Sequence, residues 1–133
     1  MDATVGIPPA PTEETDGFWA AAAQGRLVIE RCTACGAGSH PPYGACRQCR
    51  SRVLEPVEVT GTGTVYSVTV NQQRWMPELA VPYAVVLVDL DEHPGVRIVG
   101  RGPLDAAIGM KVRAGTEPGP DGVAIPSFEA VTP

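Results

Sequence analysis

The 133-residue chain contains few aromatic residues and no long apolar segment. Aromatics make up 5% of it, whereas 15 glycines and 14 prolines interrupt regular structure throughout. This balance favours short strands and many turns over long helices. No window reaches the roughly 18 apolar residues of a membrane span. No basic stretch followed by an apolar run marks a secretory signal either. We therefore expect a cytoplasmic protein without a membrane segment.

Motifs that carry catalysis are equally scarce. The sequence has no nucleophile elbow, no phosphate-binding loop and no dinucleotide-binding glycine fingerprint. Its two histidines, His40 and His93, are interpreted as a surface-loop residue and a turn residue. Asp89, Asp91 and Glu92 precede His93 in a pattern typical of a solvated hairpin tip, without the spacing of a calcium loop. We expect no catalytic residue in this chain.

Negative charge predominates, with a net charge of −5, but the basic residues are clustered. Residues 26–52 contain five arginines and a single glutamate, and Arg47, Arg50 and Arg52 are the densest group. Nonspecific nucleic-acid binding depends largely on neutralising phosphates, so the acidic balance of the chain argues against it. The local basic patch fits either a phosphate-bearing small molecule or an acidic partner surface.

All four cysteines lie between Cys32 and Cys49, as two C-x-x-C pairs that also include Cys35 and Cys46. Such a pair places two thiolates on one side of a tetrahedral site, and Gly36 suits the tight turn after the first pair. The spacing predicts one structural Zn²⁺ per chain, because four thiolates leave no open coordination position. Iron bound as in rubredoxin, which would indicate an electron carrier, and a redox dithiol are the rival readings. His40 as a replacement ligand is a further alternative.

The pattern of apolar residues predicts a mainly β fold. A short helix ends at Gly25, and either Thr12 caps it or it begins only near Gly17. A strand over 26–32 leads into the cysteines. Five more strands are expected, which fit a five-stranded Greek-key barrel of the OB type, with a β-sandwich as the alternative. Pro126 places an edge or a bulge in the last strand. These five strands are expected at 63–72, 82–90, 96–101, 109–117 and 123–131.

Large apolar side chains occur at two places where they are costly to expose. Phe18 and Trp19 stand in the short helix, and Trp75 and Met76 stand in the loop after the first barrel strand. Each pair either packs on the protein's own domains or contacts a partner protein. We retain both interpretations for all four residues.

The order of these parts resembles the acyl-CoA-associated zinc-ribbon plus OB-fold family known as domain of unknown function 35. The resemblance spans roughly residues 12–131 and rests on the motifs "GRLVIERCTACG", "PPYGACRQC", "PYAVVLVDL" and "IGMKVR". It implies a tail and helix over 1–25, a rubredoxin-like zinc ribbon over 26–53 and an OB-fold domain over 54–133. It also implies Cys32, Cys35, Cys46 and Cys49 as the zinc ligands.

Members of this family accompany thiolase-superfamily enzymes as scaffolds. The resemblance therefore implies a non-catalytic subunit of a hetero-oligomer that supports acyl-CoA chemistry by a thiolase or retro-aldolase type of enzyme, in lipid or steroid side-chain metabolism. Arg47, Arg50 and Arg52 are then candidates for contacting the phosphates of coenzyme A. The alternative function is a single-stranded nucleic-acid-binding OB module with a structural zinc.

Overall fold

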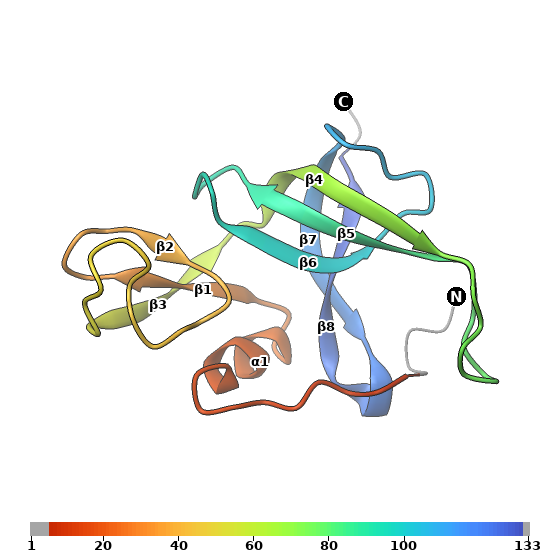
Figure 1. Cartoon of the computed structure of the whole chain (residues 1–133), viewed down its shortest axis with the longest axis horizontal. Coiled ribbons are helices and arrows are strands. Elements are labelled where there is room, and N and C mark those ends of the chain that lie inside the picture. The colour runs from red at the N-terminus through yellow and green to blue at the C-terminus, as the bar shows by residue number, and fades with distance from the viewer. Residues whose placement is uncertain (1–5, 132–133) are drawn as a thin grey trace.

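The computed structural model describes residues 6–131 as a helix, a three-stranded ribbon and a closed five-stranded barrel (Figure 1). The ribbon lies at one end of the molecule, and the helix lies beside both the ribbon and strand β8 of the barrel. The elements are α1 (Asp16–Ala22), β1 (Leu27–Cys32), β2 (Gly38–Ser39), β3 (Leu54–Val59), β4 (Thr62–Asn71), β5 (Tyr83–Leu90), β6 (Arg97–Gly102), β7 (Lys111–Pro118), the 3-10 turn η1 (Pro120–Gly122) and β8 (Ala124–Ala130).

Helix α1 begins at Asp16, close to the later of its two expected starts and not at a cap on Thr12. Its N-cap is Thr15, and the backbone N–H of Thr12 donates to Thr15 Oγ1 at 2.8 Å in the turn before the helix. Gly25 follows the helix with a φ of 78°, a left-handed conformation that glycine adopts without steric cost. The helix buries Phe18, Ala21 and Ala22 against the rest of the chain.

The ribbon sheet has the order β2-β1-β3 and is antiparallel throughout. Strands β1 and β3 pair along their whole length, from Leu27 opposite Val59 to Cys32 opposite Leu54. Strand β3 was not among the predicted strands, because its glutamates and Pro56 obscure the apolar pattern. It opens the segment predicted as barrel, yet it hydrogen-bonds to the ribbon.

Strands β4 to β8 close the barrel in the order β4-β5-β6-β8-β7. All neighbours are antiparallel except β6 and β8, which run parallel and pair at Arg101 and Ser127 alone. This is the five-stranded Greek-key barrel of an OB fold, so the predicted fold class is confirmed. Pro126 lies in β8, next to Ser127 of the single β6–β8 pair. Proline has no backbone N–H to donate, which fits the sparse pairing between these two strands.

A single apolar core joins helix, ribbon and barrel. Ile29 of the ribbon and Ile98 of the barrel are both almost fully buried and belong to one cluster with Phe18 of α1. Glu92 adds a polar link, since its carboxylate accepts hydrogen bonds from the backbone N–H and the hydroxyl of Thr60 at 2.7 and 2.6 Å. The metal-binding ribbon is therefore held in a defined position on the barrel.

Candidate metal centre and apolar groove

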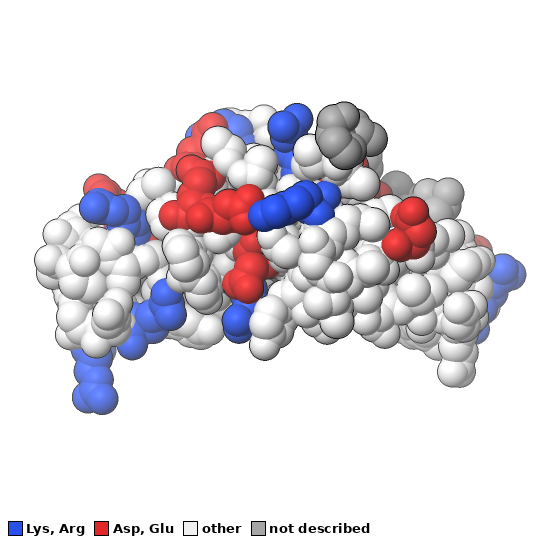
Figure 2. Space-filling view, turned by 90° about the horizontal axis from the view of Figure 1, so that it is seen from above, with Lys and Arg blue, Asp and Glu red and all other residues white. Residues whose placement is uncertain are grey.

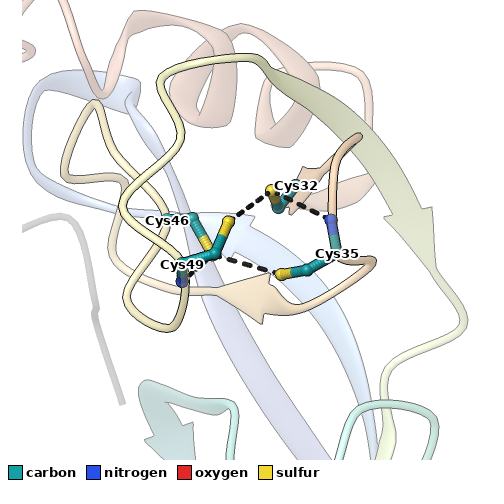
Figure 3. A group of neighbouring side chains, drawn as sticks. All are labelled: Cys32, Cys35, Cys46 and Cys49. Atoms are coloured by element: carbon teal, nitrogen blue, oxygen red, sulfur yellow. Dashed lines mark hydrogen bonds between the residues drawn. The ribbon is translucent and has the colours of Figure 1, made fainter.

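The four cysteines come together at the end of the ribbon. Cys32 is the last residue of β1, Cys35 lies in the turn to β2, and Cys46 and Cys49 lie in the loop between β2 and β3. Figure 3 shows their sulfurs pointing toward one another. The Sγ atoms of Cys32 and Cys49 are 3.5 Å apart, those of Cys35 and Cys46 are 3.6 Å apart, and all four lie within 4.8 Å of one another.

The two C-x-x-C turns have the same backbone geometry. In the first, the N–H of Gly36 donates to the carbonyl of Cys32 at 2.9 Å, and in the second, the N–H of Arg50 donates to the carbonyl of Cys46 at 3.0 Å. Gly36 has a φ of 82° and Arg50 a φ of 66°, so both are left-handed. The second turn therefore has an arginine where glycine is the residue of lowest steric cost.

Backbone hydrogen bonds lower the pKa values of the Cys46 and Cys49 thiols, whereas burial raises them. Backbone N–H groups of Cys49 and Gln48 lower the pKa of the Cys46 thiol to about 6. A backbone hydrogen bond from Ser51 favours the Cys49 thiolate, but the side-chain contact with Cys32 and burial outweigh it and raise the pKa of Cys49 to about 12. Four thiolates this close together therefore need a cation to be ionised at once.

The sulfur positions fit a tetrahedral zinc ion. Zn–S bonds of about 2.3 Å place tetrahedral sulfurs about 3.8 Å apart, close to the 3.5 and 3.6 Å observed. Four such sulfurs saturate the ion and leave it no position for a substrate or a water molecule. A metal in this centre supports the fold and takes no part in a reaction.

The ribbon arginines differ in what they contact. Arg26 and Arg31 form ion pairs with Glu58 and Glu55, both at 3.0 Å. Arg47 is occupied as well, because its Nε donates to the carbonyl of Gly38 at 2.8 Å. In contrast, the side chains of Arg50 and Arg52 form no ion pair or hydrogen bond within residues 6–131. Of the three arginines predicted to contact phosphate, these two are the ones available for it.

Three of the four predicted partner-contacting residues, Phe18, Trp19 and Trp75, line an open apolar groove. One part of it, about 330 Å³, lies between α1, the loop after β2, and strands β5, β6 and β8. A second part, about 390 Å³, lies next to it beneath the loop that carries Trp75. Both parts are lined by Trp19, which is half-buried. Phe18 is only 7% exposed and packs edge-on against Trp19, so it supports the wall of the groove. Met76 is half-buried and lines neither part.

His40 is not the surface-loop histidine that we expected. Its ring lies 4.9 Å from that of Phe18, centroid to centroid, and its Nδ1 is buried without a hydrogen-bond partner in the described part of the chain. Burial lowers the pKa of His40 to about 4. The sequence did not reveal this, because helix α1 covers the histidine from a distant part of the chain. His40 lies outside the cysteine cluster and is not one of its ligands.

The acidic hairpin is more ordered than a solvated tip. Asp89 pairs with Arg97 at 3.1 Å and Asp91 with Lys111 at 3.3 Å, while Glu92 is bound to Thr60. The carboxylates are thus engaged separately and do not converge on a cation. Figure 2 shows acidic side chains gathered in the middle of one face, with basic side chains beside them and further charged side chains toward both ends of the molecule.

The two histidines have no hydrogen-bond partner of a catalytic kind among residues 6–131. Neither His40 nor His93 forms a hydrogen bond with an acid, a hydroxyl or a thiol there, so neither has the partner that a nucleophile or a general base requires. The same described segment has no helix long and apolar enough to cross a membrane.

Two family models match the chain in succession. Residues 19–55 match the model for the rubredoxin-like zinc ribbon domain of ChsH2, and residues 56–117 match the model for the C-terminal OB-fold domain of ChsH2. The first match and the clustered thiols confirm zinc as the cofactor.

Two similar proteins are named as alpha subunits of hydratases. The chain is 43% identical over 108 residues to a probable enoyl-CoA hydratase alpha subunit of Thermomonospora curvata, covering 78% of this chain and 34% of that protein. It is 37% identical over 118 residues to the 3-oxo-4,17-pregnadiene-20-carboxyl-CoA hydratase alpha subunit of Mycobacterium tuberculosis, covering 86% and 37%. The chain thus spans about a third of the length of these relatives.

Two solved structures share the fold. A chain of the Ltp2-ChsH2(DUF35) aldolase superposes with a TM-score of 0.83 and 35% identity, covering 94% of this chain and 100% of that one. A DUF35 protein of unknown function from Sulfolobus solfataricus superposes with a TM-score of 0.65 at 16% identity, covering 90% and 86%, which supports the fold alone. The cysteine centre, the barrel topology and these matches together show that the chain belongs to the ChsH2-type DUF35 family, a zinc ribbon followed by an OB-fold domain.

Proposed function

We propose that this chain is a cytoplasmic, non-catalytic subunit that binds a thiolase-superfamily enzyme of the aldolase type and supports its acyl-CoA chemistry in lipid or steroid side-chain metabolism. The complex is a hetero-oligomer in which the partner carries the reacting groups. The observation that carries this proposal is a zinc centre saturated by four thiols, in a described chain whose histidines lack any catalytic partner.

The relatives support an acyl-CoA context. Two are named as alpha subunits of CoA-thioester hydratases, and a structure with 35% identity is an aldolase that pairs ChsH2 with Ltp2. The hydratase relatives are nearly three times as long as the matched segment, so we do not transfer hydratase activity to this chain. The aldolase chain matches along its full length and is the better guide to the function.

Arg50 and Arg52 are the residues that we assign to the phosphates of coenzyme A. Both are exposed and have no partner side chain in the described chain, and guanidinium groups bind phosphate oxygens in a bidentate geometry. Arg50 also occupies a left-handed position at a steric cost, which favours a role for its side chain. Arg47 instead fastens the cysteine loop to Gly38.

Single-stranded nucleic-acid binding is less well supported. OB-fold domains of that kind stack bases on exposed aromatic rings. Here the guanidinium of Arg97 lies 3.8 Å above the ring of Tyr66, and that of Arg101 lies 4.0 Å from the ring of Tyr83. One face of each barrel tyrosine is therefore covered.

The test is co-expression of this chain with an Ltp2-type enzyme of the same organism. We expect the two to elute as one complex, with acyl-CoA cleavage by the complex and none by this chain alone. The double variant Arg50→Glu, Arg52→Glu should raise the KM of the complex for its acyl-CoA, whereas Arg26→Glu serves as a control in the same ribbon. Separate elution together with full activity of the enzyme alone would refute the proposal, as would thioester turnover by this chain alone.

A further inference from the structure

The four cysteines of the metal centre (Figure 3) differ in their exposure to solvent. Cys32 is fully buried and Cys46 is 2% exposed, whereas Cys35 and Cys49 are exposed residues. In each C-x-x-C turn the fold thus covers the first cysteine and leaves the second one accessible. An electrophile or an oxidant in solution therefore meets Cys35 and Cys49 before it meets the other two.

Backbone hydrogen bonds protect the two buried sulfurs further. The Sγ atom of Cys32 accepts a hydrogen bond from the N–H of Cys35 at 3.4 Å. The Sγ atom of Cys46 accepts the N–H groups of Gln48 and Cys49 at 3.3 and 3.4 Å. Each bond stabilises negative charge on the sulfur, which makes that sulfur a weaker nucleophile.

The two exposed cysteines differ from each other in the same respect. A backbone hydrogen bond from Ser51 reaches the sulfur of Cys49. The Sγ atom of Cys35 contacts that of Cys46 at 3.6 Å but accepts no backbone N–H within residues 6–131. Within this described segment, Cys35 is therefore the one ligand that is both exposed and without a backbone donor to its sulfur.

Protonation does not rank the four sulfurs once the metal is bound. Cysteine binds zinc as the thiolate, so in the loaded centre every sulfur is in the form that attacks electrophiles. Their reactivities are then set by access and by hydrogen bonding, and both place Cys35 first.

We propose that Cys35 is the modification site of the metal centre, the sulfur at which peroxide or a carbon electrophile attacks the zinc-loaded protein and thereby releases the metal. With hydrogen peroxide, the Cys35 sulfur attacks one oxygen atom and the O–O bond breaks. The sulfur is oxidised by two electrons to a sulfenic acid, and the departing hydroxide takes up a proton to give water. The centre is left with three thiolates and loses its closed tetrahedral shell.

Release of the metal acts on more than the first turn. The loop between β2 and β3 contains Cys46 and Cys49 and also carries Arg50 and Arg52. The metal fixes this loop to the end of β1, so its loss frees the segment that carries both arginines. Modification of Cys35 therefore disables the ribbon as a unit. This inference stands independently of the proposed function.

The test treats the zinc-loaded full-length chain with less than one equivalent of iodoacetamide and maps the modified cysteines by peptide mass spectrometry. The attacking sulfur forms a thioether and iodide leaves, so the first site is recorded permanently. We expect singly modified protein to carry the label at Cys35 about fivefold or more as often as at Cys49. A chromogenic chelator should record zinc release at the rate of Cys35 labelling. Hydrogen peroxide followed by dimedone, which traps sulfenic acids, should label the same residue.

Two matched variants test the same ranking through the metal. Cys35→His and Cys49→His each replace one exposed thiolate by a nitrogen ligand, and three cysteines with one histidine form a common structural zinc site. Zinc release by iodoacetamide should slow by about fivefold or more in Cys35→His and stay within about twofold of the wild type in Cys49→His. Zinc content and thermal melting show that each variant is loaded and folded. If either variant does not hold zinc, the mapping of the wild-type protein decides.

Three results would overturn the inference. The first is labelling shared evenly between Cys35 and Cys49, or concentrated at Cys49. The second is protein labelled at all four cysteines with no singly modified form, because the metal then leaves before any sulfur reacts. The third is a zinc-loaded protein that resists iodoacetamide while the zinc-free protein is alkylated. None of these results bears on binding of the thiolase-superfamily partner, so the proposed function is tested separately.

Discussion

Protonation of His40 should destabilise this protein as the pH falls. The imidazole lies against Phe18 with its Nδ1 buried, and burial lowers its pKa from 6.5 to about 4. The unfolded chain therefore binds a proton between these pH values while the folded chain does not, so stability is lost as the pH falls from about 6.5 to about 4. The loss works out at about 2 kcal/mol at pH 5 and about 3 kcal/mol below pH 4.

The assay is urea denaturation of the zinc-loaded protein at pH 7.5 and pH 5, with His40→Leu as the comparison. Leucine removes the titrating group and the unpaired nitrogen, so the variant should lose about 2 kcal/mol less than the wild type between the two pH values. Both proteins contain the same thiols, so proton binding to the cysteines cancels in the difference. His93→Gln controls for the loss of a histidine. Equal pH dependence of the wild type and His40→Leu would refute the reasoning.

Three further predictions concern the ribbon and its attachment. Chelation of the metal, or Cys32→Ser, should unfold the ribbon and lower the melting temperature of the protein. Metal analysis of the wild-type protein should find one zinc per chain in a colourless sample. A red, iron-loaded protein would instead support an electron carrier. Arg50→Gly should raise the free energy of unfolding by up to about 1 kcal/mol in urea denaturation, whereas Gly36→Ala should lower it by about as much, because both positions are left-handed. A change of the same sign in both variants would contradict this prediction. Hydrogen bonds from Thr60 lower the pKa of the Glu92 carboxyl, so its contribution is present above the ordinary pKa and lost as the pH falls through the lowered one. Glu92→Gln should therefore destabilise the protein by about 1 kcal/mol at pH 7 and have little effect near pH 3, as measured by denaturation at both values.

Features that depend on neighbouring residues were predicted from the sequence. The spacing of Cys32, Cys35, Cys46 and Cys49 indicated zinc, because each C-x-x-C turn brings its two sulfurs together through local backbone geometry. Alternating apolar residues likewise predicted the strands of the barrel. Gly25, at a position where φ is positive, marked the end of the helical segment.

Features that depend on pairing between distant segments were not predicted. Strand β3 is polar and contains Pro56, and it is a strand because β1 pairs with it along its full length. The sequence indicated a surface residue at His40, because only the fold shows that α1 covers it. The same holds for the arginines. Only the fold shows that Arg47 binds Gly38, while Arg50 and Arg52 have no ion-pair or hydrogen-bond partner among residues 6–131.

By itself, the sequence determined a four-thiol zinc centre, a mainly β chain and a protein without a catalytic motif. The tertiary structure alone decided that helix, ribbon and barrel share one core, and that Trp19, Arg101 and Trp75 line one groove. The physical reason is the separation in sequence of the residues that interact. The two cysteines of each C-x-x-C turn are three residues apart, whereas a core and a groove form only when segments remote in the sequence pack together and bury apolar surface.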